Sequence, residues 1–143
     1  MPIDEFHRLP GETPERDNNL QHGDLIVAID LPPGSNFAKN CYYLKVRDRA
    51  SYAFALVAVA AALELDGDTI RQARVVLGGV AHKPWRTREV EATLSGKRAS
   101  EETFRQAATA ALADAKPLAH NAYKIELAKR AIVRALMRAS KLA

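Results

Sequence analysis

The first 80 residues contain four segments whose apolar positions alternate with polar ones, or follow one another without a break, as in β-strands. These segments are residues 24–31, 37–46, 54–65 and 70–80. The third is apolar on both faces and rich in alanine, so its composition also allows a helix. The turn sequence Asp-Gly-Asp-Thr at 66–69 joins it to the fourth as in a tight hairpin, which favours two strands. Two glycines at 78–79 indicate a β-bulge or a place where another backbone comes close.

The apolar pattern takes on a helical period after residue 87. A short helix is expected over 88–94, a second from Ser100 to the residues before Pro117, and a long third one from Asn121 onwards. Each follows a residue type that commonly caps helices, and the candidate caps are Thr87, Ser100 and Asn121. Strands that all precede the helices are typical of an α+β fold. We therefore expect an antiparallel β-sheet of about four strands, followed by helices packed on one face.

Residues 1–23 differ from the rest of the chain because they are rich in turn-forming residues and poor in apolar ones. A domain rarely begins with such a long lead that adds little to a core. We expect an extended connecting segment whose upstream partner is missing. Residues 24–143 are then expected to form a single α+β domain, with its strands within residues 24–80 and its helices within 87–140.

The composition is that of one soluble domain. The 143 residues are 48% hydrophobic and 27% charged, which are ordinary values. Cys41 is the single cysteine, which excludes an internal disulfide framework, a cysteine-ligated iron–sulfur cluster and a four-thiolate zinc site. The longest apolar run, residues 53–63, has about half the length that spans a bilayer, and no signal peptide is visible. These features predict a cytoplasmic protein with no membrane partner.

The net charge of +4 is unevenly distributed, because residues 115–143 carry seven lysines and arginines and a single acid, Glu126. A basic end of a chain can bind nucleic acid. These cations, however, lie on a predicted helix whose opposite face is apolar. No interleaved aromatic residues or known nucleic-acid motif accompany them. We therefore expect no nucleic-acid partner.

Common catalytic patterns do not occur in the sequence. It has no glycine-rich dinucleotide or phosphate loop, its histidines are scattered, and its carboxylates suggest no acid–base pair. The chain by itself does not look like a complete enzyme. Its most unusual feature is a charged corner at residues 45–49 (KVRDR), close before the apolar run. This corner is either a site for an anionic or polar ligand, or a solvated turn that keeps an apolar strand from aggregating.

Several sequence blocks resemble, in the same order, the C-terminal domain of the FAD-binding subunit of molybdenum hydroxylases. This family contains xanthine dehydrogenase, aldehyde oxidoreductase and carbon monoxide dehydrogenase. The blocks are FHRLPGETP at 6–14, GDLIVAIDLP at 23–32, KVRDRASYAFA at 45–55, LGGVAHKPWR at 77–86, NAYK at 121–124 and LAKR at 127–130. Each block is moderately specific. Because they run in order from about residue 6 to about residue 135, the resemblance extends over nearly the whole chain.

The resemblance implies a role in flavin chemistry. In such enzymes, electrons from a substrate oxidised at a molybdenum cofactor pass through [2Fe-2S] clusters to FAD, and then to an acceptor. The domain closes over the flavin. The implied partners are the FAD-binding N-terminal portion, which carries glycine-rich loops, an iron–sulfur subunit and a molybdenum subunit.

The resemblance also implies three residues at the flavin, namely Ile26, Lys45 and Arg49. Ile26 is expected to pack near the isoalloxazine ring, Lys45 to place its ammonium near the polar edge of the flavin, and Arg49 to lie close by. A cation there stabilises the negative charge that develops on reduction, and so raises the flavin potential. The alternatives are plain sheet packing for Ile26 and an ion pair with Asp48 or another acid for Arg49.

The sequence departs from the family pattern because the glycine-rich flavin-binding portion is absent. Met1 stands at what corresponds to the middle of such a subunit. We therefore expect the chain alone to bind FAD weakly or not at all, since the loops that cradle its phosphates are missing. The chain is then a cloned domain, a truncated gene product or a separately encoded half. The alternative function is a stand-alone protein-interaction module derived from this domain, with no redox role.

Overall fold

The computed structural model describes residues 1–34 and 36–142. Within them, four strands form one antiparallel sheet in the order β1-β2-β3-β4. The strands are β1 (Cys41–Val46), β2 (Val57–Asp66), β3 (Thr69–Gly78) and β4 (Trp85–Arg86). The helices are α1 (Ile3–Phe6), α2 (Arg88–Leu94), α3 (Glu101–Ala111) and α4 (Tyr123–Ala139).

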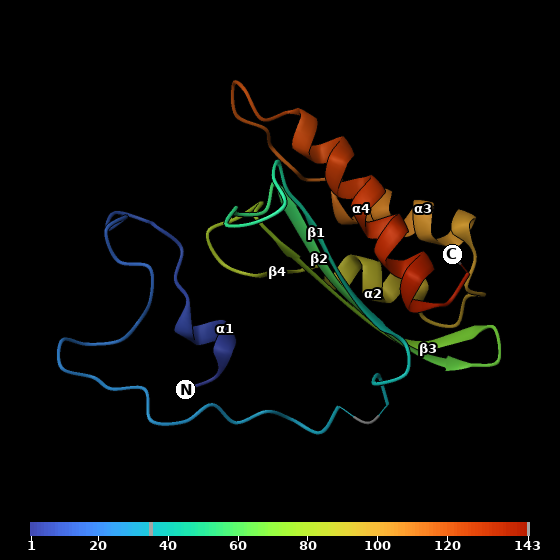
Figure 1. Ribbon diagram of the computed structural model, residues 1–143, viewed down its shortest axis with the longest axis horizontal. Coiled ribbons are helices and arrows are strands. Elements are labelled where there is room, and N and C mark those ends of the chain that lie inside the picture. The colour runs from blue at the N-terminus through green and yellow to red at the C-terminus, as the bar shows by residue number, and fades with distance from the viewer. Residues whose placement is uncertain (35, 143) are drawn as a thin grey trace.

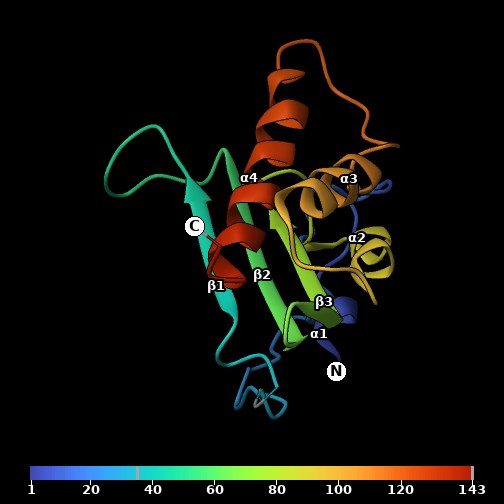
Figure 2. The same cartoon turned by 90° about the vertical axis from the view of Figure 1, so that its right-hand side faces the viewer.

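Helices α2, α3 and α4 all pack on the same face of the sheet (Figure 1). They stand in front of the strands in Figure 2, whereas the N-terminal segment with α1 lies on the opposite side. This arrangement confirms the predicted α+β class, an antiparallel sheet with helices on one face. Helices α2, α3 and α4 leave the other face of the sheet uncovered, and it is called the helix-free face below.

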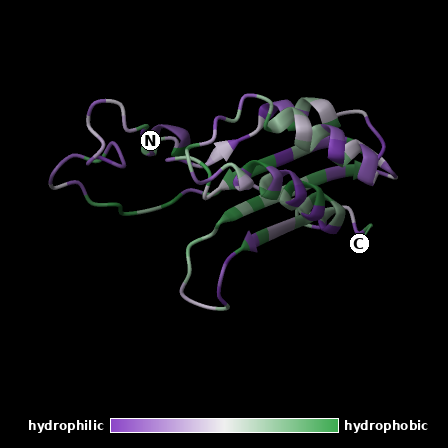
Figure 3. Cartoon of the chain, turned by 90° about the horizontal axis from the view of Figure 1, so that it is seen from above, coloured by the Kyte–Doolittle hydropathy of each residue, from purple (hydrophilic) through white to green (hydrophobic). Residues whose placement is uncertain are grey.

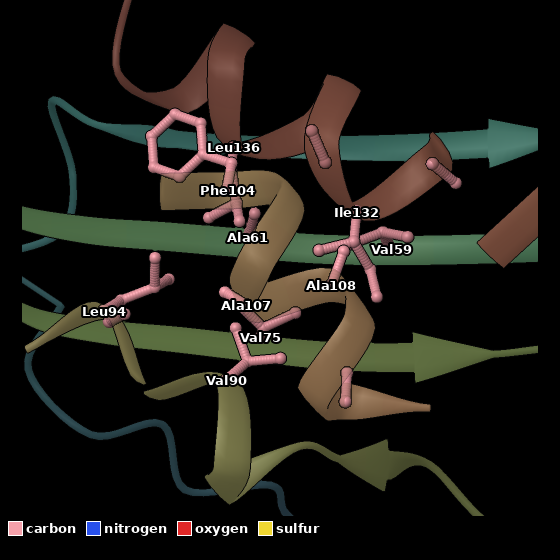
Figure 4. Packing of buried hydrophobic residues seen from close by; sticks show 14 of the residues in the cluster. Val59, Ala61, Val75, Val90, Leu94, Phe104, Ala107, Ala108, Ile132 and Leu136 are labelled. Carbon is pink, nitrogen blue, oxygen red and sulfur yellow. The ribbon is translucent and has the colours of Figure 1, made fainter. Parts of the chain in front are cut away.

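The hydrophobic core lies between the sheet and these helices. Alternate residues of β2 are buried on the helix side, because successive side chains of a strand point to opposite faces. Figure 4 shows Phe104 of α3 and Ile132 and Leu136 of α4 beside Val59 and Ala61 of β2. All five side chains are essentially inaccessible to solvent. The core therefore holds the helices against one face of the sheet, and the opposite face can contact other groups.

The predicted hairpin between the two central strands is confirmed. Asp66 pairs with Thr69 across the turn, and Gly67 adopts a left-handed φ of +57°. The glycines at 78–79 mark a close backbone approach, the second of the two alternatives. A Cβ on Gly79 would lie 2.8 Å from the carbonyl oxygen of Ala55. The loop after β3 is therefore packed against the chain entering β2.

The helix caps agree with the prediction only in part. Ser100 caps α3, since its hydroxyl accepts a hydrogen bond from the Thr103 amide at 3.2 Å. Thr87 occupies the N-cap position of α2, but its buried hydroxyl donates to the Val75 carbonyl at 3.0 Å instead. Asn121 does not cap α4. Its side-chain oxygen accepts from the Leu118 amide, and α4 begins after Ala122.

The strand predicted over residues 24–31 is wrong. The segment is neither a strand nor a helix, and its apolar side chains face solvent, with Leu25 82% and Val27 87% exposed. It appears in Figure 3 as a hydrophobic stretch of the extended N-terminal arm, away from the sheet. A strand requires a hydrogen-bonded neighbour, and the described residues supply none here. The fourth strand of the sheet is instead β4, which is too short to produce a periodic pattern.

Two further outcomes concern the N-terminal segment and the end of α3. Residues 1–23 contain α1 and a bridge between His7 and Asn18, so this segment has some local structure. The boundary between it and the domain at residue 23 stays a prediction. Helix α3 ends at Ala111, before Pro117, because the chain turns at residues 112–114.

Candidate functional site

The helix-free face of the sheet is built from small side chains. Lys45, Ala58 and Gly78 are aligned across β1, β2 and β3 in one row. Tyr43, Ala60 and Val76 form the next row. Because side chains alternate along a strand, both rows lie opposite the buried positions of β2. The result is a flat apolar surface with a tyrosine and a lysine on β1.

A pocket of about 320 Å³ opens on this face. Its floor contains Ala58, Ala60 and Gly78, and Tyr43 stands at one side. The loop after β3 contributes His82 and Lys83, and the N-terminal segment contributes His7. The Lys83 ammonium donates to the Asp4 carbonyl at 3.0 Å, which ties this loop to the N-terminal segment. The pocket thus has an apolar floor and polar groups at its edge, which suits a planar aromatic group with polar substituents.

Lys45 lies at the end of β1 next to this pocket. Its strand partner is Ala58, part of the pocket floor, and Tyr43 precedes it on the same face. The Lys45 side chain is exposed and has no hydrogen bond or ion pair with another described residue. A lysine on a strand is better fixed in position than one on a loop. Lys45 is therefore available to a group that approaches this face.

Arg49 lies in the loop between β1 and β2 and is engaged locally. Its guanidinium donates two hydrogen bonds to the Tyr52 carbonyl, the one from Nε at 3.1 Å. Tyr52 has a left-handed φ of +49°, so Arg49 supports a strained turn. In the part of the chain that the structure describes, Arg49 makes no ion pair with Asp48 or any other acid. The same loop exposes Tyr52 and Phe54 almost completely.

Ile26 lies in the extended segment and is 55% exposed. It does not pack in the sheet, which was the alternative to a ligand contact. None of Ile26, Lys45 and Arg49 lines the pocket, although Lys45 pairs in register with Ala58, which does. The three predicted site residues are therefore not gathered into one site within this chain. Their roles at a flavin stay predictions.

Sequence reasoning missed the other residues of the pocket. His7, His82 and Lys83 are separated along the chain and come together only because the N-terminal segment lies against the loop after β3. All three fall inside the blocks that carried the resemblance, which is the signal that could have identified them. No cluster of three or more histidine, cysteine, aspartate or glutamate side chains suited to a metal occurs in residues 1–34 and 36–142.

An ion cluster holds α2 against the sheet edge. The Glu91 carboxylate accepts two hydrogen bonds from Arg86 of β4, both at 2.8 Å, and lies 3.8 Å from Arg74 of β3. Burial acts to raise the pKa of Glu91, but the hydrogen bonds and charge of Arg86 outweigh it. The Val75 amide and Arg74 act in the same direction, so the Glu91 pKa is lowered from its ordinary value of 4.5. This cluster is structural, since it joins β3, β4 and α2.

Comparison with known proteins assigns the fold to a family. Residues 42–139 match the family described as the CO dehydrogenase flavoprotein C-terminal domain. The chain belongs to this family. The match begins in β1 and ends at the last residue of α4, so it covers the whole sheet-and-helix unit. The family resemblance found in the sequence blocks is confirmed.

The most informative relative is the aldehyde oxidoreductase FAD-binding subunit PaoB of Escherichia coli K12. It is 46% identical over 136 residues, which are 94% of this chain and 39% of PaoB. Among solved structures, quinoline 2-oxidoreductase from Pseudomonas putida 86 matches with a TM-score of 0.68 and 26% identity, over 74% of this chain and 38% of the matched chain. Carbon monoxide dehydrogenase from Hydrogenophaga pseudoflava matches with a TM-score of 0.65 and 30% identity, over 71% and 37%.

The chain spans about two-fifths of the length of these relatives. The match to PaoB spans 136 residues and is therefore longer than the family domain, which covers residues 42–139. No helix among the described residues is both long and apolar enough to cross a membrane.

Proposed function

We propose that this chain is the part of an FAD-binding subunit of a molybdenum-containing hydroxylase that closes over the flavin. One observation carries the proposal. The helix-free sheet face presents an apolar pocket floor beside an exposed lysine that has no partner among the described residues. The 46% identity to a subunit named as FAD-binding supports the same assignment.

The residues present fit one wall of a flavin site. FAD supplies the transfer of electrons when it is bound. The small side chains at Ala58, Ala60 and Gly78 leave room for a flat ring system, and the Lys45 ammonium is placed to stabilise negative charge at its edge. Arg49 acts mainly by holding the turn that follows Lys45. The FAD phosphates are bound by a portion of the subunit outside this chain.

The extended segment over residues 24–31 joins this domain to that portion. Its exposed alternating apolar positions and its backbone groups are those of a strand without a neighbour. We infer that it pairs with a strand of the flavin-binding portion, which brings Ile26 to the flavin. Partner subunits that carry a molybdenum cofactor and [2Fe-2S] clusters would supply electrons to FAD held at this site. Such assembly agrees with the name of the relative, which is a subunit of an aldehyde oxidoreductase.

The role of Lys45 is tested by the reduction potential of FAD in the assembled subunit. Replacing Lys45 by alanine removes a partly exposed charge, whose interaction with reduced flavin is worth about 1 kcal/mol. For a two-electron couple this lowers the potential by about 20 mV. Lys39→Ala, an exposed lysine in the turn before β1, is the matched control and is expected to change nothing. Equal potentials and equal flavin content in both variants would place the flavin elsewhere and favour a protein-interaction module without a redox role.

A further inference from the structure

A groove between α3 and α4 opens on the helical side of the domain, away from the free face of the sheet. Its volume is about 490 Å³. Ala108 of α3 and the half-buried Val133 and Met137 of α4 give it an apolar floor. These positions are spaced four residues apart on α4, so they form one continuous stripe along the helix.

The groove is lined by more cations than acids. Arg105 of α3 and Lys129, Arg130 and Arg134 of α4 border it, together with Glu101 and Glu126. Arg105 pairs with Glu101, and Arg130 pairs with Glu126. The side chains of Lys129 and Arg134 have no hydrogen bond or ion pair among the described residues. Two cationic side chains beside an apolar floor are therefore free to meet an external partner.

The charges of the two helices act on one another across the groove. The hydrogen bond from Arg130, together with the charges of Lys129 and Arg105, lowers the pKa of Glu126 from its ordinary value. The sequence of α4 also places Arg130, Arg134 and Arg138 at successive intervals of four residues. Like charges at this spacing destabilise a helix by about 0.2–0.5 kcal/mol per pair. The ion pair of Arg130 with Glu126 offsets part of this repulsion within the chain, and an anionic partner at Arg134 would offset more of it.

We propose that the groove between α3 and α4 docks an acidic amphipathic helix of a protein partner. Apolar side chains of that helix would cover Val133 and Met137, and its carboxylates would pair with Lys129 and Arg134. The residues that line the groove include no aromatic side chain on which bases could stack. A protein helix is therefore favoured over nucleic acid, and this proposal does not depend on flavin binding.

The test uses the whole chain and a synthetic peptide of about 18 residues, or five helical turns. The peptide carries leucines at i, i+3, i+4 and i+7 and glutamates elsewhere. A scrambled peptide of the same composition, a random-sequence DNA duplex and phosphatidylserine vesicles are tested in parallel. Binding is measured by fluorescence titration at two salt concentrations. We expect saturable binding of the amphipathic peptide that weakens as salt rises, with weaker binding of the other three probes.

The double variant Lys129→Glu with Arg134→Glu is expected to weaken peptide binding at least about tenfold, because two attractive contacts become repulsive. The control Arg88→Glu with Lys97→Glu makes the same change in net charge at exposed positions outside the groove, and is expected to bind as the wild type does. Lys129→Gln with Arg134→Gln, a milder change to the fold, is expected to give an intermediate loss. Equal losses in the groove and control variants, or preferential binding of the scrambled peptide, the duplex or the vesicles, would overturn the proposal.

Discussion

Replacing Gly79 by alanine tests the close contact between the loop after β3 and the start of β2. Gly79 has a φ of +74°, which costs a residue with a Cβ about 1–2 kcal/mol. Its Cβ would also lie 2.8 Å from the Ala55 carbonyl oxygen and 3.2 Å from that of Leu56. These oxygens are held in place, since the Leu56 amide donates to the Val46 carbonyl at 2.8 Å. Relieving the clash costs about 1–3 kcal/mol more.

The expected total is a loss of about 3 kcal/mol in the free energy of unfolding, measured by urea denaturation. This corresponds to a fall in Tm of about 10 °C for a domain of this size. Gly67→Ala is the matched control, because Gly67 also has a positive φ, of +57°, but nothing lies within 4 Å of its added Cβ. The free energy of unfolding of Gly67→Ala should fall only by the cost of placing an alanine at a positive φ, about 1–2 kcal/mol. If Gly79→Ala loses no more stability than Gly67→Ala, the packing of this loop is wrong.

Three further predictions concern the core, the ion cluster and the extended segment. Phe104→Ala, at a fully buried position between the sheet and α4, should lower the free energy of unfolding by about 3–5 kcal/mol in urea denaturation. A loss below about 1 kcal/mol would contradict the packing of Phe104 in the core. Because the pKa of Glu91 is lower in the folded state than in the unfolded state, its ionised carboxylate stabilises the fold at pH values above the unfolded-state pKa. This stabilisation is lost as the pH falls through the folded-state pKa. Stability should therefore fall more steeply below about pH 5 in the wild type than in Glu91→Gln, and parallel pH profiles would refute this. Val27→Ser should change the unfolding free energy of the chain alone by less than about 0.5 kcal/mol, because Val27 is exposed; a larger loss would mean that the segment packs on the domain.

The central part of the fold could be predicted because its signals are local. The turn at 66–69 and the apolar runs on either side fix a hairpin without reference to the rest of the chain. The amphipathic pattern of α3 and α4 likewise requires only one apolar surface to pack against. By contrast, residues 24–31 have the pattern of a strand, but the neighbour that would pair with them is not among the described residues. A pattern identifies which side chains need burial and cannot supply the surface that buries them.

The candidate site could also be predicted only in part, where its signals are local. The aromatic and β-branched content of residues 37–46 predicted a strand that includes Lys45, and the structure adds its register with Ala58. The hydrogen bonds of Arg49 to a backbone carbonyl could not be predicted, because they depend on the left-handed turn at Tyr52. The meeting of His7 with His82 and Lys83 at one pocket depends on contacts between distant segments.

The most direct test of the flavin site combines this chain with the remaining part of an FAD-binding subunit such as PaoB, of which this chain matches 39%. The measured quantity is the FAD retained after gel filtration. We predict no FAD with the chain alone and stoichiometric FAD in the complex. Ala60→Arg, which places a bulky cation on the pocket floor, should abolish retention, whereas Ala92→Arg on the exposed side of α2 should not. Retention of FAD by the chain alone, or equal retention by the two variants, would contradict a flavin site closed by the helix-free face of this sheet.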